Sequence, residues 1–367
     1  MIGMDAITKD RNLEQFIRTI QNNCDISDAS GSGIFSICGM ALRLRDLNKW
    51  EKGFKPWEEN NSAELVDWID HKEQLWEKIE GQAFAPLPLF EMEYDPFDTG
   101  TINEILSPLN LFYGAGYAHS LKPTFFLAGI KETRCLYGIP IVILEKELLR
   151  DLLTIPALNQ DGFILIRRDA ACLFLWDQMV YLKKSGQRFL HFALKQCGLP
   201  DTRPESRKTH FESILSVQEQ TYIHHEIGEM KDTVFDHQIF REIISEFPHT
   251  PVELLARTVK DLLADTMAHG TLEHIISTKN AAGLGFYAAF QDGLFLPLFP
   301  QLRNAFEKFA SDQDWEGIES ARQKGLLTAR QYARDLIAIF CNAADKNHKD
   351  QVAEKIFKTL FLNGIAQ

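Results

Sequence analysis

Apolar and charged residues alternate along most of the chain at spacings of three and four. Residues 34–50 and 62–79 each carry an apolar stripe interrupted by charged positions. This periodicity is typical of amphipathic helices with one buried face. The pattern predicts helices over 11–23, 34–50 and 62–79, with a loop at 27–33 where serine and glycine are dense.

A different pattern follows in the middle of the chain. Residues 125–144 are rich in Phe, Ile, Val and Leu and are broken by a charged stretch and a glycine, and residues 163–166 are similar. β-branched and aromatic residues favour strands. We therefore expect a β-hairpin or small sheet here, accompanied by helices over 146–153 and 169–184.

The polar, proline-flanked stretch 200–208 predicts a domain boundary. On this interpretation residues 1–203 form a mixed, mostly helical domain with a small β element, and residues 204–367 form an all-α helical bundle. The fold class is thus mainly α. The apolar pattern predicts C-terminal helices over 209–246, 251–277, 280–292, 301–311, 314–324, 328–344 and 347–362.

Composition narrows the classes of partner. The 367 residues carry a net charge of -12, and the sequence pI is near 5.4. Because binding to nucleic acid or to an anionic membrane needs a concentrated cationic surface, neither partner is expected. The N-terminus lacks the apolar segment of a signal peptide, and the six cysteines include no C-x-x-C pair. We expect a cytoplasmic protein.

Two C-terminal segments combine acidic residues and histidines at whole-turn spacings. On helices of 3.6 residues per turn, each set of three shares a face. The glutamates of the first set lie beside an apolar stripe, and the histidine and glutamate of the second set interrupt one. Burying carboxylates and imidazoles costs several kcal/mol unless they are paired or bind an ion. The first set is Glu219, Tyr222 and Glu226, and the second is Asp265, His269 and Glu273.

These residues predict a metal site of oxygen and nitrogen donors, suited to iron, manganese or zinc. Tyr222 and His225 are expected to hydrogen-bond to the ligands. The function would be that of a metal-dependent oxidoreductase or hydrolase, with a small-molecule substrate that the sequence does not name. The alternative is a protein-interaction or scaffold module in which the same groups form a buried polar network or a solvated acidic face. The expected ligands are Glu219, Glu226, Asp265, His269 and Glu273.

Two further motifs have simple structural interpretations. The acidic stretch 91–98 contains four carboxylates and is typical of a solvated loop, although it also offers oxygen ligands for a cation. Residues 283–288 match the G-x-G-x-x-A pattern of dinucleotide-binding proteins, but no strand–helix–strand unit surrounds them. Their small side chains predict close helix packing instead, and no nucleotide cofactor is expected.

Two resemblances add to this interpretation. Asp265-x-x-x-His269 and Glu219-x6-Glu226 resemble the metal-binding helices of non-haem iron oxidases related in fold to haem oxygenase, although a histidine would fit that pattern better at Glu226. That resemblance implies metal ligands on core helices. Residues 38–51, 90–98 and 113–117 resemble an uncharacterised bacterial protein family, which implies a bacterial origin and assigns no activity.

Overall fold

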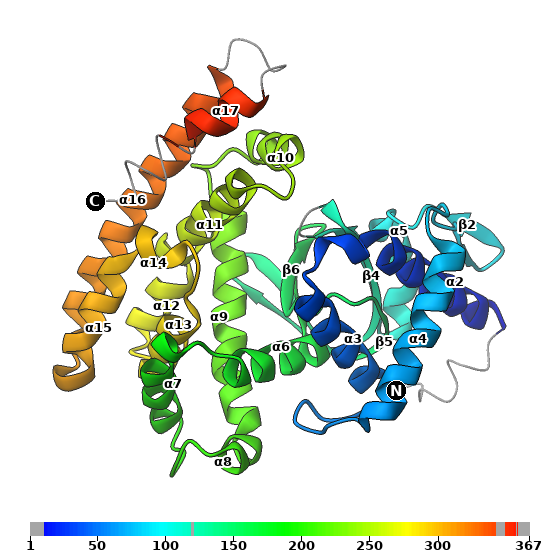
Figure 1. The fold of residues 1–367 in the computed structure, drawn as a ribbon, viewed down its shortest axis with the longest axis horizontal. Helices are drawn as coiled ribbons and strands as arrows, with labels where there is room; N and C mark the ends of the chain where they lie inside the picture. The colour runs from blue at the N-terminus through cyan, green and yellow to red at the C-terminus, as the bar shows by residue number, and fades with distance from the viewer. Residues whose placement is uncertain (1–10, 119–120, 343–348, 357, 359–367) are drawn as a thin grey trace. The chain divides into compact units, whose positions relative to one another are not determined.

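The computed structural model describes residues 11–118, 121–342, 349–356 and 358 (Figure 1). The chain divides into two compact units, the first ending at Asp177 and the second beginning at Gln178. Helices make up most of the regular structure, which confirms the mainly α class. Within the described ranges, no helix has the length and apolar character needed to cross a membrane.

Three long helices open the N-terminal unit. Asn61 caps the third by accepting hydrogen bonds from the N–H groups of Ala63 and Glu64, and this helix has the bounds that its apolar stripe predicts. An asparagine at this position satisfies N–H groups that have no partner within the helix. The helices are α2 (Arg11–Gly31), α3 (Ile37–Glu51) and α4 (Ser62–Ile79).

The predicted loop at 27–33 is wrong for its first five residues, because α2 continues to Gly31. The Nζ atom of Lys122 lies 2.7 Å from Ser27 Oγ and 3.0 Å from Asp28 Oδ1, and all three residues are buried. Asp28 also accepts the backbone N–H of Leu152. Residues that are typical of turns stay helical here because their side chains have buried partners.

Five strands form one sheet in the order β3-β4-β5-β7-β6. β4 and β5 form a long hairpin whose turn residues, Tyr137 and Gly138, both have positive φ, as two-residue hairpin turns favour. β7 pairs in parallel with β5, whereas the other neighbours are antiparallel. The sheet is larger than predicted, and comprises β3 (Leu111–Tyr117), β4 (Pro123–Leu136), β5 (Ile139–Arg150), β6 (Ala157–Gln160) and β7 (Phe163–Arg167).

The helix predicted over 146–153 is wrong, because β5 extends to Arg150. Glu147 and Arg150 look like exposed positions in the sequence, yet both are buried. Arg167 Nε lies 2.6 Å from Glu147 Oε1, and Arg150 Nη1 lies 3.3 Å from Glu147 Oε2. Because these charged residues are paired inside the protein, they are buried although a sequence pattern treats them as exposed, and the segment is therefore mistaken for an amphipathic helix.

A small two-stranded sheet and a short helix complete this unit. The strands are β1 (Leu87–Leu89) and β2 (Met92–Tyr94), and the helix is α5 (Thr99–Leu106), capped by Asp98. Leu87, Ile102 and Phe125 meet in a core that α2 also enters. This core anchors the segment that contains β1.

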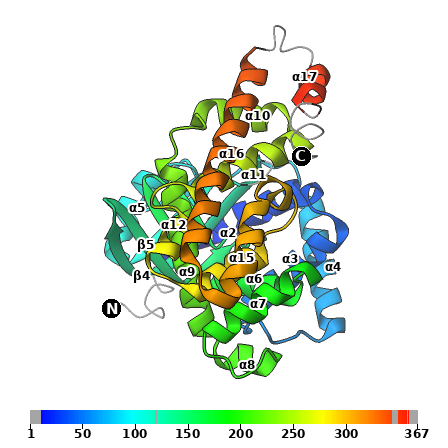
Figure 2. The ribbon, with the colours of Figure 1, turned by 90° about the vertical axis from the view of Figure 1, so that its left-hand side faces the viewer.

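The C-terminal unit is built from helices in the described residues. α6 (Arg168–Val180) contains the division between the units. Figure 2 shows α16 running beside α15, and it also packs on α11. The remaining helices are α7 (Lys184–Gln196), α8 (Pro204–Thr209), α9 (Phe211–Lys231), α10 (His237–Glu246), α11 (Pro251–Thr266), α12 (Thr271–Ser277), α13 (Ala281–Phe290), α14 (Phe295–Leu298), α15 (Pro300–Asp312), α16 (Trp315–Cys341) and α17 (Lys349–Ile356).

Two helices predicted as continuous are interrupted. The helix predicted over 209–246 includes a break after Lys231, where Asp232 accepts the N–H groups of Val234 and Phe235. The helix predicted over 251–277 breaks after Thr266, and His269 in this turn has a φ of 66°. Conversely, the two helices predicted within 314–344 are the single helix α16. At the first break, hydrogen bonds to the short side chain of Asp232 end a helix that apolar periodicity alone would continue.

Candidate metal centre

Helices α9 and α11 approach each other closely at a glycine. A Cβ atom on Gly228 would collide with the carbonyl oxygen of Ala264, and so would one on Gly270 in the turn after α11. Because neither position has a side chain, the backbones of α9 and α11 come close together, and the helical turns next to this contact face each other. One face carries His225 and Glu229, and the other carries Asp261 and Asp265, each pair being one helical turn apart.

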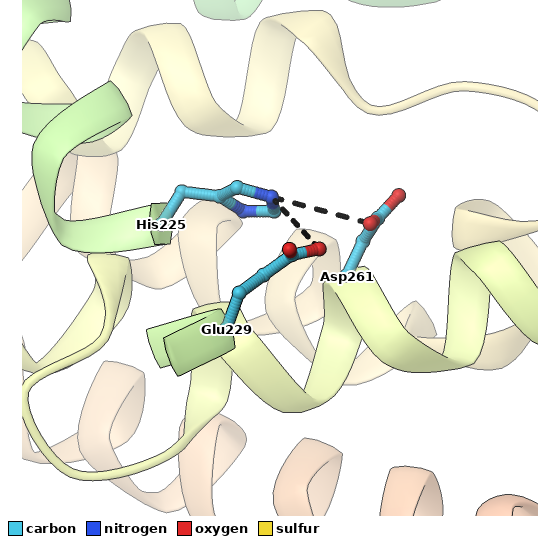
Figure 3. Close-up of side chains that lie close together, drawn as sticks. All are labelled: His225, Glu229 and Asp261. Atoms are coloured by element: carbon cyan, nitrogen blue, oxygen red, sulfur yellow. Dashed lines mark ion pairs between the residues drawn. The ribbon is translucent and has the colours of Figure 1, made fainter. Parts of the chain in front are cut away.

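Three of these side chains converge on one point (Figure 3). His225 Nε2 lies 3.9 Å from Glu229 Oε1 and 4.0 Å from Asp261 Oδ1. One ligand atom from each of the three residues lies within 4.8 Å of the other two. In the figure, the imidazole and both carboxylates point toward the same space. An imidazole nitrogen with two carboxylate oxygens is a donor set for a transition-metal ion.

Asp265 holds the imidazole from the other side. His225 Nδ1 lies 3.0 Å from Asp265 Oδ1, which also accepts a hydrogen bond from the hydroxyl of Thr271 at 2.6 Å. The hydroxyl of Tyr287 donates to Asp265 Oδ2 at 2.9 Å. If the imidazole is neutral and donates through Nδ1–H, its lone pair is on Nε2 and points toward Glu229 and Asp261. Metal-binding histidines are commonly oriented by a carboxylate in this way.

The pKa values at this site reflect crowded carboxylates. Burial lowers the pKa of His225, but the charges of Asp265, Asp261 and Glu229 outweigh burial and raise it well above its ordinary value. Burial, with the charges of Glu229 and Asp265, raises the pKa of Asp261 to about 7, although 39% of its side chain is exposed. Positive charge, as protons or as a metal ion, is what this group of side chains requires.

A lysine also borders the site. Lys260 Nζ lies 3.1 Å from Glu229 Oε2 and 4.7 Å from the centre of the Phe240 ring. Once His225 gives up its proton to bind an ion, three ionised carboxylates and the lysine carry a net charge of about -2. A divalent cation would bring the local charge to zero.

Comparison with known families covers nearly the whole chain. The N-terminal domain of a family of unknown function (DUF6866) matches residues 15–167, and the C-terminal domain of the same family matches residues 173–359. The chain belongs to this family. No curated protein and no solved structure matches it. The resemblance to an uncharacterised family is thereby confirmed, and the candidate metal centre lies in the C-terminal domain of a DUF6866 protein.

The structure gathers only part of the predicted ligand set of this DUF6866 chain. Asp265 is at the centre, where it hydrogen-bonds to His225 as described above. Glu219 and Glu226 are buried on α9, as their position beside an apolar stripe predicts, and Tyr222 lies between them on that helix. In the described residues, the three side chains whose ligand atoms gather are His225, Glu229 and Asp261. Metal binding by the five predicted ligands stays a prediction.

His269 and Glu273 lie at the turn that joins α11 to α12. Glu273 accepts the backbone N–H of His269, and both side chains are about two-fifths exposed. Beside them the rings of His224 and His274 stack with centroids 3.8 Å apart, and His224 Nδ1 lies 2.9 Å from the carbonyl of His269. Burial and the neighbouring His224 lower the pKa of His274 to about 4. This stack fixes the turn against α9.

The other two sequence motifs have structural roles. Residues 283–288 lie inside α13, where a Cβ on Gly285 would lie 2.9 Å from that of Ala193, so the glycine permits close packing on α7. In the acidic stretch, Glu91 and Glu93 are exposed, whereas Asp95 and Asp98 accept backbone N–H groups. Residues 283–288 thus have the packing role that their small side chains predict, whereas the acidic stretch is largely exposed but includes strand β2 and is not a loop throughout.

We expect Gly228→Ala to lower the free energy of unfolding by about 1–3 kcal/mol, because its Cβ would push α9 away from α11. Alanine ordinarily stabilises a helix relative to glycine. Gly100→Ala, in α5 with open space around the Cβ position, is therefore the control and should not destabilise the protein. Urea titration measures both variants. Equal stability of Gly228→Ala and the wild type would contradict the close packing at this crossing.

Proposed function

We propose that this protein binds a divalent transition-metal ion through His225, Glu229 and Asp261. The observation that carries the proposal is the convergence of their three ligand atoms, with the imidazole held by Asp265 on its far side. Ligand atoms around a tetrahedral ion with bonds of roughly 2.1 Å lie about 3.4 Å apart. The separations of 3.9 and 4.0 Å need to close by only about half an ångström around such an ion.

The donor set favours iron, manganese or zinc. One imidazole and two carboxylates lack the thiolates of a copper or structural zinc site. Three protein ligands also leave at least one coordination position open, which is typical of catalytic rather than structural sites. Of the three side chains, Asp261 and His225 are the more exposed, at 39% and 28%, so a small molecule can approach from their side.

A bound ion would supply Lewis acidity, which is the chemistry that metal-dependent hydrolases and oxidoreductases share. Asp265 would keep the imidazole lone pair directed at the ion, and Thr271 and Tyr287 would hold Asp265 in place. Lys260 would bind Glu229 and provide a cation beside the site. The proposal is thus a metal-dependent enzyme acting on a small molecule.

Elemental analysis tests this proposal. Protein purified without chelators, or reconstituted separately with iron, manganese and zinc, should retain close to one equivalent of one of these metals after dialysis. Absence of retained metal in every preparation would contradict the proposal. It would favour the scaffold alternative, in which protons shared among His225, Asp261 and Asp265 give a purely structural network.

We also propose that the protein works in the cytoplasm. The six cysteines all lie in the described residues and all are free thiols, as is usual in a reducing compartment. Cell fractionation that places the protein among secreted or membrane proteins would contradict this.

A further inference from the structure

A lysine is held against the candidate metal centre. Lys260 directly precedes Asp261 on α11, and its Nζ lies 3.1 Å from Glu229 Oε2. The other oxygen of this carboxylate, Oε1, is the one that lies 3.9 Å from His225 Nε2 (Figure 3). Glu229 therefore offers one oxygen to an ion while the other binds an ammonium group.

The position of this lysine is fixed by packing. Its side chain is 12% exposed, and Nζ lies 4.7 Å from the centre of the Phe240 ring. Phe240 is itself buried on α10. An ammonium group over an aromatic ring is attracted to the face of the ring. Lys260 thus places a positive charge beside the site, and solvent screens a partly buried charge less than a surface one.

No second lysine or arginine shares this position in the described residues. Each of the three acidic side chains of the site pairs with His225, and only Lys260 adds another cation to them in this part of the chain. The acidic side chains are Glu229, Asp261 and Asp265. Burial raises the pKa of Asp261, and the charged groups with the largest further influence on it are His225, Glu229, Asp265 and Lys260. The charge of the site is therefore set by these five side chains.

These charges balance those of a divalent ion. When the imidazole is neutral and binds an ion, the three carboxylates and the lysine carry a net charge of about -2. A divalent ion makes the group neutral, whereas a trivalent ion leaves an excess positive charge next to the ammonium group of Lys260. Excess charge in a partly buried site is unfavourable.

We propose that Lys260 confines the site to ions in the divalent state, so that the bound ion acts as a Lewis acid and is not itself oxidised. Lys260 can have this role only if the proposed metal site exists, and the role distinguishes between the two reaction classes that the site allows. An oxidoreductase that uses a single iron or manganese ion would raise the charge of that ion, and the ammonium group opposes this step. Hydrolysis leaves the charge of the ion unchanged, because water is divided between the two products and no electron is transferred. The charges thus favour a metal-dependent hydrolase over an oxidoreductase.

The reduction potential of bound iron tests this role in the full chain. Lys260→Gln removes the charge and keeps an N–H donor for Glu229. Its ferric form should be favoured over the ferrous form at least about tenfold more than in the wild type, which lowers the potential of a one-electron couple by about 59 mV. A titration with redox mediators, followed by the electron paramagnetic resonance signal of the ferric ion, measures the potential.

Three further variants separate the charge of the lysine from its packing. Lys260→Met removes the charge with an apolar chain of similar length and should lower the potential as Lys260→Gln does. Lys260→Arg keeps the charge and should retain the wild-type potential. Lys308→Gln makes the same change in net charge at an exposed lysine on α15 and should also retain it.

The outcomes separate the role of Lys260 from the metal site itself. Failure of the wild type to bind ferrous iron would overturn this role, and retention of zinc or manganese would show whether the metal site survives without it. Iron with the same potential in the wild type, Lys260→Gln and Lys260→Met would overturn the role of the lysine alone. An equal fall of the potential in Lys260→Arg would do so too, because the lysine would then act through its shape rather than its charge.

Discussion

His225→Ala should lower the affinity for the preferred metal by at least about 10- to 100-fold. Loss of a residue that only hydrogen-bonds to a ligand usually costs this much, and loss of the ligand itself should cost at least as much. The variant removes Nε2, the nitrogen that faces both Glu229 and Asp261. Competition with a chromogenic chelator measures the dissociation constant. His237→Ala is the matched control, because this exposed histidine on α10 lies outside the group and should bind metal as the wild type does.

Asp265→Asn tests the residue that hydrogen-bonds to the ligand His225, rather than the ligand itself. An amide can still accept a hydrogen bond from His225 but carries no charge, so we expect a smaller loss of affinity than for His225→Ala. If His225→Ala and His237→Ala bound metal equally well, the histidine would have no part in metal binding.

The second large effect is expected in the N-terminal unit. Lys122→Met should lower the free energy of unfolding by about 3–5 kcal/mol, because it leaves buried carboxylates without their cation. Lys122 Nζ lies 3.0 Å from Asp28 and 3.8 Å from Asp151, and all three side chains are at most 1% exposed. Lys131→Met is the control: its pair with Glu145 is exposed, so the loss should be no more than about 1 kcal/mol.

The loss caused by Lys122→Met should depend on pH. Burial raises the pKa of Asp28 to about 7, against the lowering effect of Lys122. An aspartate with a pKa above its unfolded value of about 3.9 binds more protons in the folded state, so its contribution to stability falls as pH rises between these values. Without the lysine the pKa rises further. Urea titrations should therefore show a smaller loss near pH 5 than near pH 8, and a loss independent of pH would contradict burial of an unpaired charge.

The sequence correctly predicts the elements whose buried residues are apolar and whose charged residues are exposed. α4 has the predicted bounds because its buried residues are apolar, and the β4–β5 hairpin is recognisable from its β-branched residues. The prediction fails where charged residues are internal. The end of β5 contains Glu147 and Arg150, and the end of α2 contains Asp28, and all three are buried in ion pairs that no local pattern indicates.

The sequence predicts only part of the site, for a related reason. His225 and Asp265 are on the expected helices, but Glu229 and Asp261 are not among the expected ligands. The sequence pattern favours the glutamates next to the apolar stripe of α9 instead, although several faces of this helix are buried. The face that meets α11 is set by contact of Gly228 with the Ala264 carbonyl, which a single sequence does not reveal. Whole-turn spacing from His225 to Glu229 and from Asp261 to Asp265 is the signal that could have found them.

Anomalous X-ray diffraction from crystals grown with zinc or manganese tests the central claim most directly, because it locates the ion itself. The account predicts one anomalous peak per chain, roughly 2.0–2.2 Å from His225 Nε2 and from a carboxylate oxygen of Glu229 and of Asp261. Asp265 should remain hydrogen-bonded to His225 without touching the ion. A peak held instead by Glu219, Glu226 or Glu273, or crystals in which these three side chains bind no metal, would contradict the account.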